Sequence, residues 1–288
     1  MSPAACPFRT TLDLFIRQAG IITKKNDEPA ARFAAELTTW LAERHIETRL
    51  NTVTPGLDIL IILGGDGTLL HVAAEAARYS IPVIGINLGH LGFLTELTKD
   101  EAFSALEDII TGTVTVEQRM MLKAQLRGTE GVFSPRYGLN EVVINKATLD
   151  KVLQLETRAN GHTITTYKAD GLIFSTPTGS TAYNLSAGGP LVYPGLASIL
   201  VTPICPFMLG SRPMLLPPDT RLATCFAGTG TQNAKVIVDG QPAWDLSADT
   251  ILEIEAAEHP LHLITSPHRD YFAILRNKLH WGIATSSF

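Results

Sequence analysis

The strongest constraint on the fold of this chain is an apolar run that ends in a glycine loop. The run, Ile59–Leu63, contains no polar side chain, which is typical of a strand buried on both faces of a sheet. The loop Gly64–Thr68 follows directly, and Thr68–Ala77 has the leucine and alanine spacing of a helix. A strand, a glycine turn and a helix in succession place backbone N–H groups where they bind phosphate. We therefore predict a phosphate-binding loop at Gly64–Thr68.

Asp66 is unusual in such a loop, because its carboxylate would repel a phosphate. Its presence suggests a metal ion, a hydroxyl group to be activated, or both. Asp-Gly is also a common two-residue hairpin turn. The residues after Thr68 have helical rather than alternating spacing, which favours the phosphate-binding interpretation over the hairpin.

Composition limits the size of the core, the partners and the compartment. The 288 residues are 45% hydrophobic, enough for one large domain or two ordinary ones with a substantial core. A net charge of −5 without any Lys/Arg run argues against nucleic acid or an anionic membrane as a partner. The three cysteines are too few for a disulfide framework, and no apolar stretch reaches the roughly 20 residues of a membrane helix. Met1–Arg17 lacks the apolar core of a signal peptide, so we expect a cytoplasmic protein with reduced thiols.

The first third of the chain alternates predicted strands and helices. This alternation predicts a parallel sheet with helices on its faces, and ligands of such sheets bind outside the carboxyl ends of the strands. Both glycine-rich segments, Gly64–Thr68 and Gly85–Gly92, follow strands at such ends. The predicted strands are Ala19–Thr23, Asp58–Leu63 and Ile81–Ile86, and the predicted helices are Glu28–Arg44, Thr68–Ala77 and Asp100–Ile110.

Alternating apolar and polar residues dominate from about Val114 onward. We predict an α/β domain over residues 1–118 and an antiparallel β-sandwich over residues 119–269. Asn160-Gly161 and Asp239-Gly240 are the expected hairpin turns. One helix is expected near Ser180, and a helix within 270–288 is expected to return to the first domain. No flexible linker is evident, so a ligand site between the two domains is expected.

Two further segments carry polar groups suited to binding a ligand. Asp170–Pro190 contains a short apolar strand, a Pro/Gly break and a Ser180 helix cap, so that hydroxyls and free amides converge. A plain surface loop is the alternative interpretation. Asn140-Glu141 precedes a strand and could bind sugar hydroxyls, although an ordinary turn has the same signature. Asn184 occupies the place of the first glycine in a Gly-x-Ser-x-Gly elbow, which argues against a serine hydrolase.

Taken together, these segments resemble the bacterial NAD kinase family, the ATP-NAD kinases. The resemblance extends from Gly20 to Phe272. The Gly64–Thr68 pattern alone is shared with lipid kinases and loosely with phosphofructokinases, whereas Ser175–Tyr183 is far more specific. The matching segments, in order, are Gly64–Thr68, Asn140-Glu141, Asp170–Tyr183 and Asp239–Gln241.

The resemblance implies transfer of a phosphoryl group from ATP to the 2′-hydroxyl of the adenosine ribose of NAD, giving NADP. It implies that Asp66 is the catalytic base and that a divalent metal, Mg²⁺, offsets the charge of the donor. No residue is assigned to the metal. The absence of Gly-x₄-Gly-Lys-Ser/Thr excludes a Walker-type site. The implied phosphate-donor loop consists of Gly64, Gly65, Gly67 and Thr68.

The resemblance also implies that the β-sandwich over residues 119–269 binds NAD, and it implies a set of residues that do so. Lys168-Ala169 replaces the usual Arg-Gly, and lysine lacks the planar fork of arginine. Phe207 stands where the family usually has histidine, which puts any polar contact there in doubt. The implied NAD-binding residues are Asp66, Gly67, His71, Asn140, Glu141, Lys151, Lys168, Asp170, Thr178, Thr181, Ala182, Tyr183, Asn184, Ser186 and Gln241.

Other functions and partners are weighed against this one. A lipid or sphingoid kinase would share Gly64–Thr68 but needs an apolar pocket or membrane face. A non-catalytic NAD sensor is the alternative from another class, and the intact Asp66 argues against it. The family implies a homodimer or homotetramer formed through the β domain. The sequence leaves open ATP against polyphosphate as donor, acceptance of NADH, feedback by NADP(H), and dimer against tetramer.

Overall fold

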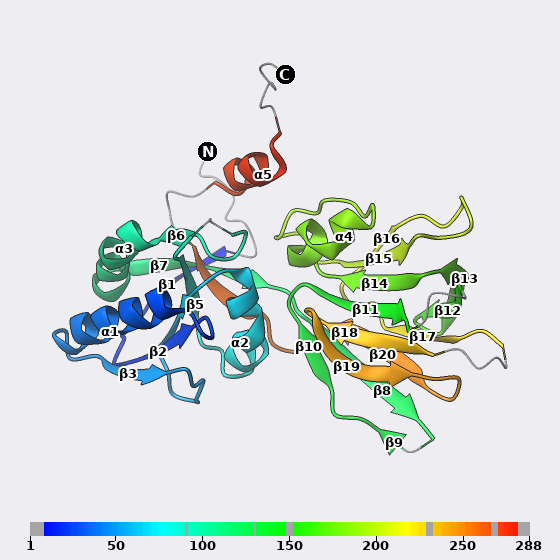
Figure 1. The fold of residues 1–288 in the computed structure, drawn as a ribbon, viewed down its shortest axis with the longest axis horizontal. Helices are drawn as coiled ribbons and strands as arrows, with labels where there is room; N and C mark the ends of the chain where they lie inside the picture. Colours follow the sequence, from blue (N-terminus) through cyan, green and yellow to red (C-terminus); the bar gives the residue numbers. More distant parts are fainter. Residues whose placement is uncertain are drawn as a thin grey trace. The chain divides into compact units, whose positions relative to one another are not determined.

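The predicted alternation of strands and helices, followed by a strand-rich region, is present in the structure. The computed structural model describes residues 9–89, 92–129, 131–147, 152–228, 233–265 and 270–281. Contacts divide the chain into two units, Met1–Gln118 with Leu261–Phe288, and Arg119–Pro260. Helices and strands alternate in the first unit, and the second consists mainly of strands (Figure 1). The predicted combination of an α/β region and an antiparallel β region is therefore confirmed.

The sheet of the first unit is parallel at its centre and mixed at one edge. Strands β3, β2, β4, β5 and β21 are successive parallel neighbours, and the short β6 also pairs in parallel with β5. The expected parallel sheet is thus extended by β1 and β7, which pair antiparallel. The strands are β1 (Arg9–Asp13), β2 (Gln18–Thr23), β3 (Glu47–Leu50), β4 (Ile59–Leu63), β5 (Val83–Asn87), β6 (Leu97–Thr98), β7 (Thr113–Arg119) and β21 (Leu261–Thr265).

Helices cover both faces of this sheet because its central strands are apolar on both sides. Ile59, Ile61 and Leu63 of β4 lie in one core with α1 and α3, and α2 contacts β4, β5 and β21. Asp27 caps α1 by accepting a hydrogen bond from the Ala30 N–H at 3.0 Å. The helices are α1 (Glu28–Ala42), α2 (Asp66–Arg78), α3 (Lys99–Thr111) and α5 (Tyr271–Leu279).

The second unit is built from two antiparallel sheets that share one core. Side chains of both sheets, such as Leu126 and Leu252 from one and Ile144 and Phe174 from the other, form a single buried cluster. The seven-stranded sheet contains β8 (Leu122–Gly128), β9 (Gly131–Val132), β10 (Arg136–Gly138), β12 (Leu153–Ala159), β13 (His162–Ala169), β17 (Leu222–Phe226) and β20 (Ile251–Ala256).

The six-stranded sheet carries the segments that the sequence marked as binding a ligand. Asn140-Glu141 leads into β11, and Asp170 precedes β14. A 3₁₀ turn, η1 (Thr178–Thr181), and α4 (Tyr183–Ser186) follow β14, where one helix was expected. The strands are β11 (Glu141–Lys146), β14 (Gly171–Ser175), β15 (Ile199–Ile204), β16 (Met214–Leu216), β18 (Ala234–Val238) and β19 (Gln241–Leu246).

Both predicted hairpin turns are confirmed. Asn160 and Gly161, with φ of 50° and 83°, connect the antiparallel strands β12 and β13. Asp239 and Gly240, with φ of 45° and 77°, connect β18 and β19. Positive φ at both central residues is what a tight two-residue hairpin requires, and Asn, Asp and Gly adopt it most readily.

Strand β21 lies in the first unit, whereas the sequence placed residues up to 269 in the second. It pairs in parallel with β5 through Leu263 and Val83. Its own sequence resembles that of the preceding strands, so local pattern carries no information on which sheet it joins. The expected tail helix is observed as α5. Within the described residues, no helix has the length and apolarity needed to span a bilayer.

Candidate functional site

Helix α2 begins inside the glycine loop, at Asp66 rather than at the predicted Thr68. Gly65 is its N-cap and supplies no capping side chain. The first N–H groups of a helix have no partner within it, so those of Gly65 to Gly67 remain for a ligand. The N–H groups of Gly64 and Thr68 are already bonded, to Ile86 at 3.0 Å and Gly65 at 2.9 Å. Of the loop amides expected to hold phosphate, these two are therefore used within the fold.

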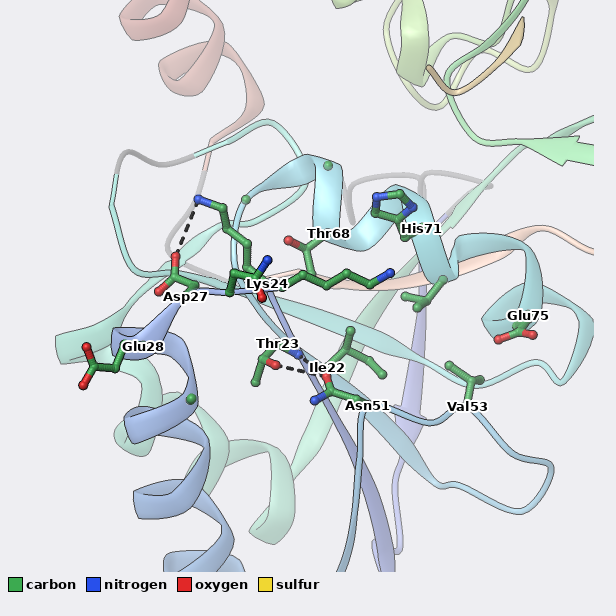
Figure 2. A pocket seen from close by; sticks show the side chains of 16 residues that line it. Ile22, Thr23, Lys24, Asp27, Glu28, Asn51, Val53, Thr68, His71 and Glu75 are labelled. Atoms are coloured by element: carbon green, nitrogen blue, oxygen red, sulfur yellow. Dashed lines mark hydrogen bonds and ion pairs between the residues drawn. The ribbon is translucent and has the colours of Figure 1, made fainter. Parts of the chain in front are cut away.

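The exposed side of this loop faces an open pocket of about 1210 Å³. The pocket lies at the carboxyl ends of β2 and β3 and along the first turns of α2, as expected for a parallel sheet. Figure 2 shows Thr68 and His71 of α2 on one side, with Lys24 and Asn51 from the loops after β2 and β3 on the other. Asp66 does not line this pocket.

Two loops that the sequence analysis did not single out shape the pocket. The side chain of Asn51, at a φ of 52°, accepts hydrogen bonds from the N–H and the hydroxyl of Thr23 at 2.8 and 3.0 Å. Lys24 forms an ion pair with Asp27 at 3.5 Å (Figure 2). Both loops follow parallel strands, so the rule that located Gly64–Thr68 also applies to them. The charged lining residues are Lys24, Lys25, Asp27, Glu28 and Glu75.

The carboxylate of Asp66 is held by the loop that follows β5. Its Oδ2 accepts a hydrogen bond from the N–H of Phe93 at 2.8 Å. Its Oδ1 accepts from the N–H of Leu94 at 3.1 Å, and from the N–H and hydroxyl of Thr95 at 3.1 and 3.0 Å. A carboxylate offers about four acceptor positions, two on each oxygen. Oδ1, with three donors sharing its two positions, can take no further donor, whereas Oδ2 has one donor and retains one position.

Gly92 is required for this contact. A Cβ at residue 92 would lie 1.9 Å from Oδ1 of Asp66, far inside any permitted contact. The glycine in the predicted segment Gly85–Gly92 thus lets the backbone close around the carboxylate. His90 and Leu91 of that segment lie outside the described residues.

Asp239 organises the Asn140-Glu141 turn in the second unit. Its carboxylate accepts hydrogen bonds from three successive backbone N–H groups. The donors are Leu139 at 2.6 Å, Asn140 at 2.9 Å and Glu141 at 3.0 Å. The sequence indicated only a hairpin turn at Asp239, and the contact joins residues about one hundred positions apart, so no local pattern reveals it.

Glu141 is buried and lacks a partner for one carboxyl oxygen. Its side chain is in a residue only 8% exposed, and Oε2 has no hydrogen bond. Burial, and then the charge of Asp239, raise the pKa of Glu141 to about 8. The hydroxyl of Thr178 is also buried without a partner. Unpartnered buried polar groups are rare in folded proteins, and these two atoms belong to residues that the sequence assigned to NAD.

Replacing Glu141 with glutamine should change how stability depends on pH. The ordinary pKa is 4.5, so between that value and about 8 the folded chain holds a proton that the unfolded chain lacks. The contribution of Glu141 to the free energy of unfolding is therefore fully present below pH 4.5. It decreases by up to about 1.4 kcal/mol per pH unit as the pH rises from 4.5 to about 8. Thermal unfolding from pH 5 to pH 9 should show Glu141→Gln gaining stability over the wild type as pH rises. A constant difference would contradict the raised pKa.

Asp170 is paired with Lys146, a residue that the sequence analysis did not single out. Its Oδ1 lies 2.7 Å from Nζ of Lys146, and both side chains are partly buried. Lys168, which the sequence assigned to this region, is exposed on β13. Lys146 was missed because its role depends on the register of β11 with β14, which places residue 145 opposite Gly171. Lys151 lies outside the described residues.

Asn184 holds its own segment together. Its Nδ2 donates to the carbonyl groups of Ser180 at 3.2 Å and Pro190 at 3.1 Å, and its Oδ1 accepts from the Thr202 hydroxyl at 2.6 Å. The residue is fully buried. Its amide therefore fixes the fold of Ser180–Pro190. Tyr183, Ser186 and Gln241 are exposed, and Thr181 and Ala182 are half-buried.

Among the described residues, no group of three or more His, Cys, Asp or Glu side chains is arranged to hold a metal ion. The two lysines of the pocket are balanced by three carboxylates, Asp27, Glu28 and Glu75. A polyphosphate in this pocket would therefore rely on the loop amides and on a cation that it carries itself.

Comparison with known proteins accounts for both units. Residues 46–114 match the ATP-NAD kinase N-terminal domain, and residues 139–266 match the ATP-NAD kinase C-terminal domain. The chain is 42% identical to an NAD kinase of Geobacter metallireducens over 283 residues, which covers 93% of this chain and 99% of that relative. It is 41% identical to an NAD kinase of Syntrophobacter fumaroxidans over 285 residues, covering 93% of this chain and all of the relative.

Solved structures agree in fold. Yeast NADH kinase, crystallised with NADH, superimposes with a TM-score of 0.85 at 23% identity, covering 95% of this chain and 90% of the yeast chain. An NAD kinase of Archaeoglobus fulgidus, crystallised with ATP, has a TM-score of 0.73 at 25% identity, covering 91% and 98%. The similarity in sequence extends over nearly the whole length of the curated relatives. The chain therefore belongs to the NAD kinase family.

Proposed function

We propose that this protein transfers the terminal phosphoryl group of ATP to the 2′-hydroxyl of the adenosine ribose of NAD, which gives NADP. The observation that carries the proposal is 42% identity to an NAD kinase across both units. The intact loop Gly64–Thr68, with Asp66 held in a fixed position, supports it. A lipid kinase, which shares only the loop, is not favoured.

The donor site that we propose is the pocket at the start of α2. Its volume, about 1210 Å³, is sufficient for a nucleotide. The N–H groups of Gly65 and Gly67 would hold the phosphates, with Lys24 and Lys25 nearby. Mg²⁺ commonly binds through substrate phosphates with few protein ligands, so Mg²⁺ carried by ATP suits a pocket without a three-residue cage. When bound, it would neutralise charge on the transferred group.

Asp66 acts on the acceptor in this proposal. The 2′-hydroxyl of NAD would donate its hydrogen bond to Oδ2, which has the remaining acceptor position. As the bond from the 2′-oxygen to the γ-phosphorus forms, the bond from that phosphorus to the ADP oxygen breaks, and the proton passes to Oδ2. The four hydrogen bonds from the loop after β5 orient the carboxylate before substrate arrives.

The remaining acceptor contacts are proposed on the positions that match the family pattern. Glu141 and Thr178 have buried atoms that a ribose or amide group could satisfy. Tyr183 is exposed enough to stack on a base. Asn184 is better described as supporting this segment than as contacting NAD. The other proposed contacts are Gly67, His71, Asn140, Lys168, Asp170, Thr181, Ala182, Ser186 and Gln241.

Gly67→Ala tests the donor site without disturbing the fold. A Cβ at residue 67 meets no atom within 4 Å, and the residue lies in helix α2, where alanine is favoured over glycine. The methyl group would instead enter the pocket that Gly67 lines. We expect KM for ATP to rise at least about tenfold, equivalent to about 1.4 kcal/mol, with an unchanged or raised melting temperature.

The control for Gly67→Ala must also place a methyl group in open space without straining the backbone. Gly56 does not qualify, because its φ of +92° is one that alanine rarely adopts. Gly210 has an open environment and no such strain, so Gly210→Ala is the control and should leave KM for ATP unchanged. An unaltered KM for ATP in Gly67→Ala, with activity retained, would place the donor phosphates elsewhere.

A direct assay tests the function itself. Purified protein is incubated with NAD, Mg²⁺ and either ATP or polyphosphate, and NADP is measured. Diacylglycerol replaces NAD in a parallel reaction. NADP formed with ATP supports the proposal, whereas a phosphorylated lipid without NADP would overturn it. We also propose that the protein is cytoplasmic and forms a homodimer or homotetramer. A monomer measured by light scattering would contradict the proposed self-association.

A further inference from the structure

Where β11 begins, the buried carboxyl group of Glu141 lies close to the half-buried Asp239. Asp239, in the turn between β18 and β19, bonds to the N–H of Glu141 at 3.0 Å, and its own N–H donates to the carbonyl of Glu141 at 3.0 Å. Glu141 is 8% exposed. Two like charges repel strongly where at least one of them is shielded from water, so such pairs commonly retain one proton.

The hydrogen bonds decide which of the two carboxyl groups keeps that proton. Burial raises the pKa of Asp239 too, but three backbone N–H donors, at 2.6, 2.9 and 3.0 Å, oppose that rise because they favour the ionised form. Glu141 has no comparable donor for Oε2. The geometry therefore places the negative charge on Asp239 and the proton on Glu141.

Among the described residues, no charge other than Asp239 is found to act on Glu141. Strand β8, which contacts β11, carries Lys123 and Arg127, but Lys123 pairs with Glu255 and Glu258, and Arg127 pairs with Glu253. Strand β14, which pairs Ser175 with Glu141, contributes no titratable side chain. On β18, Lys235 lies at the far end, opposite Asn145, and pairs with Asp245. On β10, Arg136 and Tyr137 are exposed. Asp239 is the charge that acts on Glu141.

We propose that Asp239 is a positioning residue of the acceptor site, one that fixes the Leu139–Glu141 backbone and keeps Glu141 protonated, so that Glu141 donates a hydrogen bond to the dinucleotide. This inference rests on the proposed function. The inference assigns a role to Asp239. It also makes Glu141 a hydrogen-bond donor through its O–H group, whereas an ionised glutamate could only accept hydrogen bonds.

The chemistry of the substrate fits a neutral Glu141. NAD carries a pyrophosphate, and NADP carries a further phosphate, so a second buried negative charge would disfavour both. The pKa of Glu141, raised to about 8 by burial and by Asp239, keeps it neutral at ordinary pH. Above pH 8 the donor is lost and a charge is gained. KM for NAD should then increase by up to about tenfold per pH unit.

The experiment measures kcat and KM for NAD from pH 6.5 to pH 9.5 in the wild type and in two variants. Glu141→Gln keeps an N–H donor and an acceptor but cannot ionise, so its KM at pH 7 should stay within about threefold of wild type, without the rise above pH 8. Asp239→Asn removes the second cause of the raised pKa of Glu141 and leaves the first, burial, in place. Its rise in KM should therefore begin at a lower pH than in the wild type, with a smaller change in kcat than in KM.

Glu253→Gln, at a half-exposed position of β20 where the glutamate pairs with Arg127, is the matched control and should retain the wild-type profile. Infrared spectra provide a readout without catalysis. The C=O band of a protonated carboxyl should be present at pH 7 in the wild type and absent in Glu141→Gln.

The outcomes separate this inference from the proposed function. No NADP from the wild type overturns the function. NADP formation with a KM that is constant across the pH range, or with a KM raised more than about tenfold at pH 7 by Glu141→Gln, overturns the inference alone. A protonated-carboxyl band that persists unchanged in Glu141→Gln also overturns the inference alone, because the proton would then belong to another group.

Discussion

Asp66→Asn is expected to slow NADP formation by about 10²- to 10⁴-fold while NAD binding persists. That range is the usual contribution of a general base that takes a proton in the transition state. The asparagine side chain has the same shape but cannot take the proton from the 2′-hydroxyl. Steady-state kinetics with ATP and NAD, together with calorimetric titration of NAD into each protein, would measure the two effects separately.

The structure shows that this substitution also has a conformational cost. Whichever way the asparagine amide turns, its NH₂ group faces a backbone N–H, either of Phe93 or of Leu94 and Thr95. Losing one such hydrogen bond costs about 1–3 kcal/mol. A control must therefore remove a hydrogen bond between the loop after β5 and residue 66 while keeping the Asp66 carboxylate. Thr95→Val removes the hydroxyl that bonds to Oδ1 at 3.0 Å and leaves the carboxylate intact.

Thr95→Val should reduce the rate by less than about tenfold, which corresponds to about 1.4 kcal/mol. A second variant, Gly92→Ala, keeps the aspartate but places a Cβ 1.9 Å from Oδ1, so it should displace the carboxylate and lose most of the rate. Equal losses in Asp66→Asn and Thr95→Val would show that Asp66 holds the loop and does not take the proton.

The sequence predicted the parts of the fold that have a local physical cause. The buried strand Ile59–Leu63, the amphipathic helix α1 and the hairpin at Asn160-Gly161 follow from hydrophobicity, periodicity and turn chemistry. The assignment of β21 to the first sheet has no such cause. It depends on pairing between Leu263 and Val83, far apart in the sequence.

The residues of the candidate site also fall into those that a local sequence pattern reveals and those that only the structure reveals. Asp66 is visible in the sequence because a carboxylate in a glycine loop is chemically unusual. Its four hydrogen-bond donors, in Phe93–Thr95, become visible only when two strands lie side by side. Asp239 looks like an ordinary turn residue until its contacts with Leu139 and Asn140 are known. Motifs thus identify residues that react, and the structure identifies residues that position them.

Asn184 shows how a residue within a motif can serve the fold. It lies in the segment that most specifically marks the family, yet all its polar atoms bond within the protein. Gly189 is equally constrained, because a Cβ there would lie 2.1 Å from Oδ1 of Asn184. The motif therefore specifies the shape of a loop as well as contacts with a ligand.

Gly179→Ala is the second substitution expected to have a large effect. A Cβ at residue 179 would lie 2.1 Å from the carbonyl oxygen of Asn140, and 2.5 and 2.7 Å from its carbonyl carbon and Cα. All three are backbone atoms, so no side-chain rotation relieves the overlap. The η1 turn and the Asn140-Glu141 turn would have to separate. That movement would stretch the bonds by which the Asn140 carbonyl accepts from the Thr176 N–H at 2.9 Å and the Ser175 hydroxyl at 3.2 Å.

We expect the free energy of unfolding to fall by about 3 kcal/mol or more in Gly179→Ala, as overpacking against an unyielding neighbour does. KM for NAD should rise even at temperatures where the variant stays folded, because Glu141 and Thr178 lie on the two turns that separate. Gly210→Ala, in open space, is the matched control, and chemical denaturation of both variants measures the difference. If Gly179→Ala were as stable as Gly210→Ala with an unchanged KM for NAD, the two turns would not be in contact, and the acceptor site would have to be built on other residues.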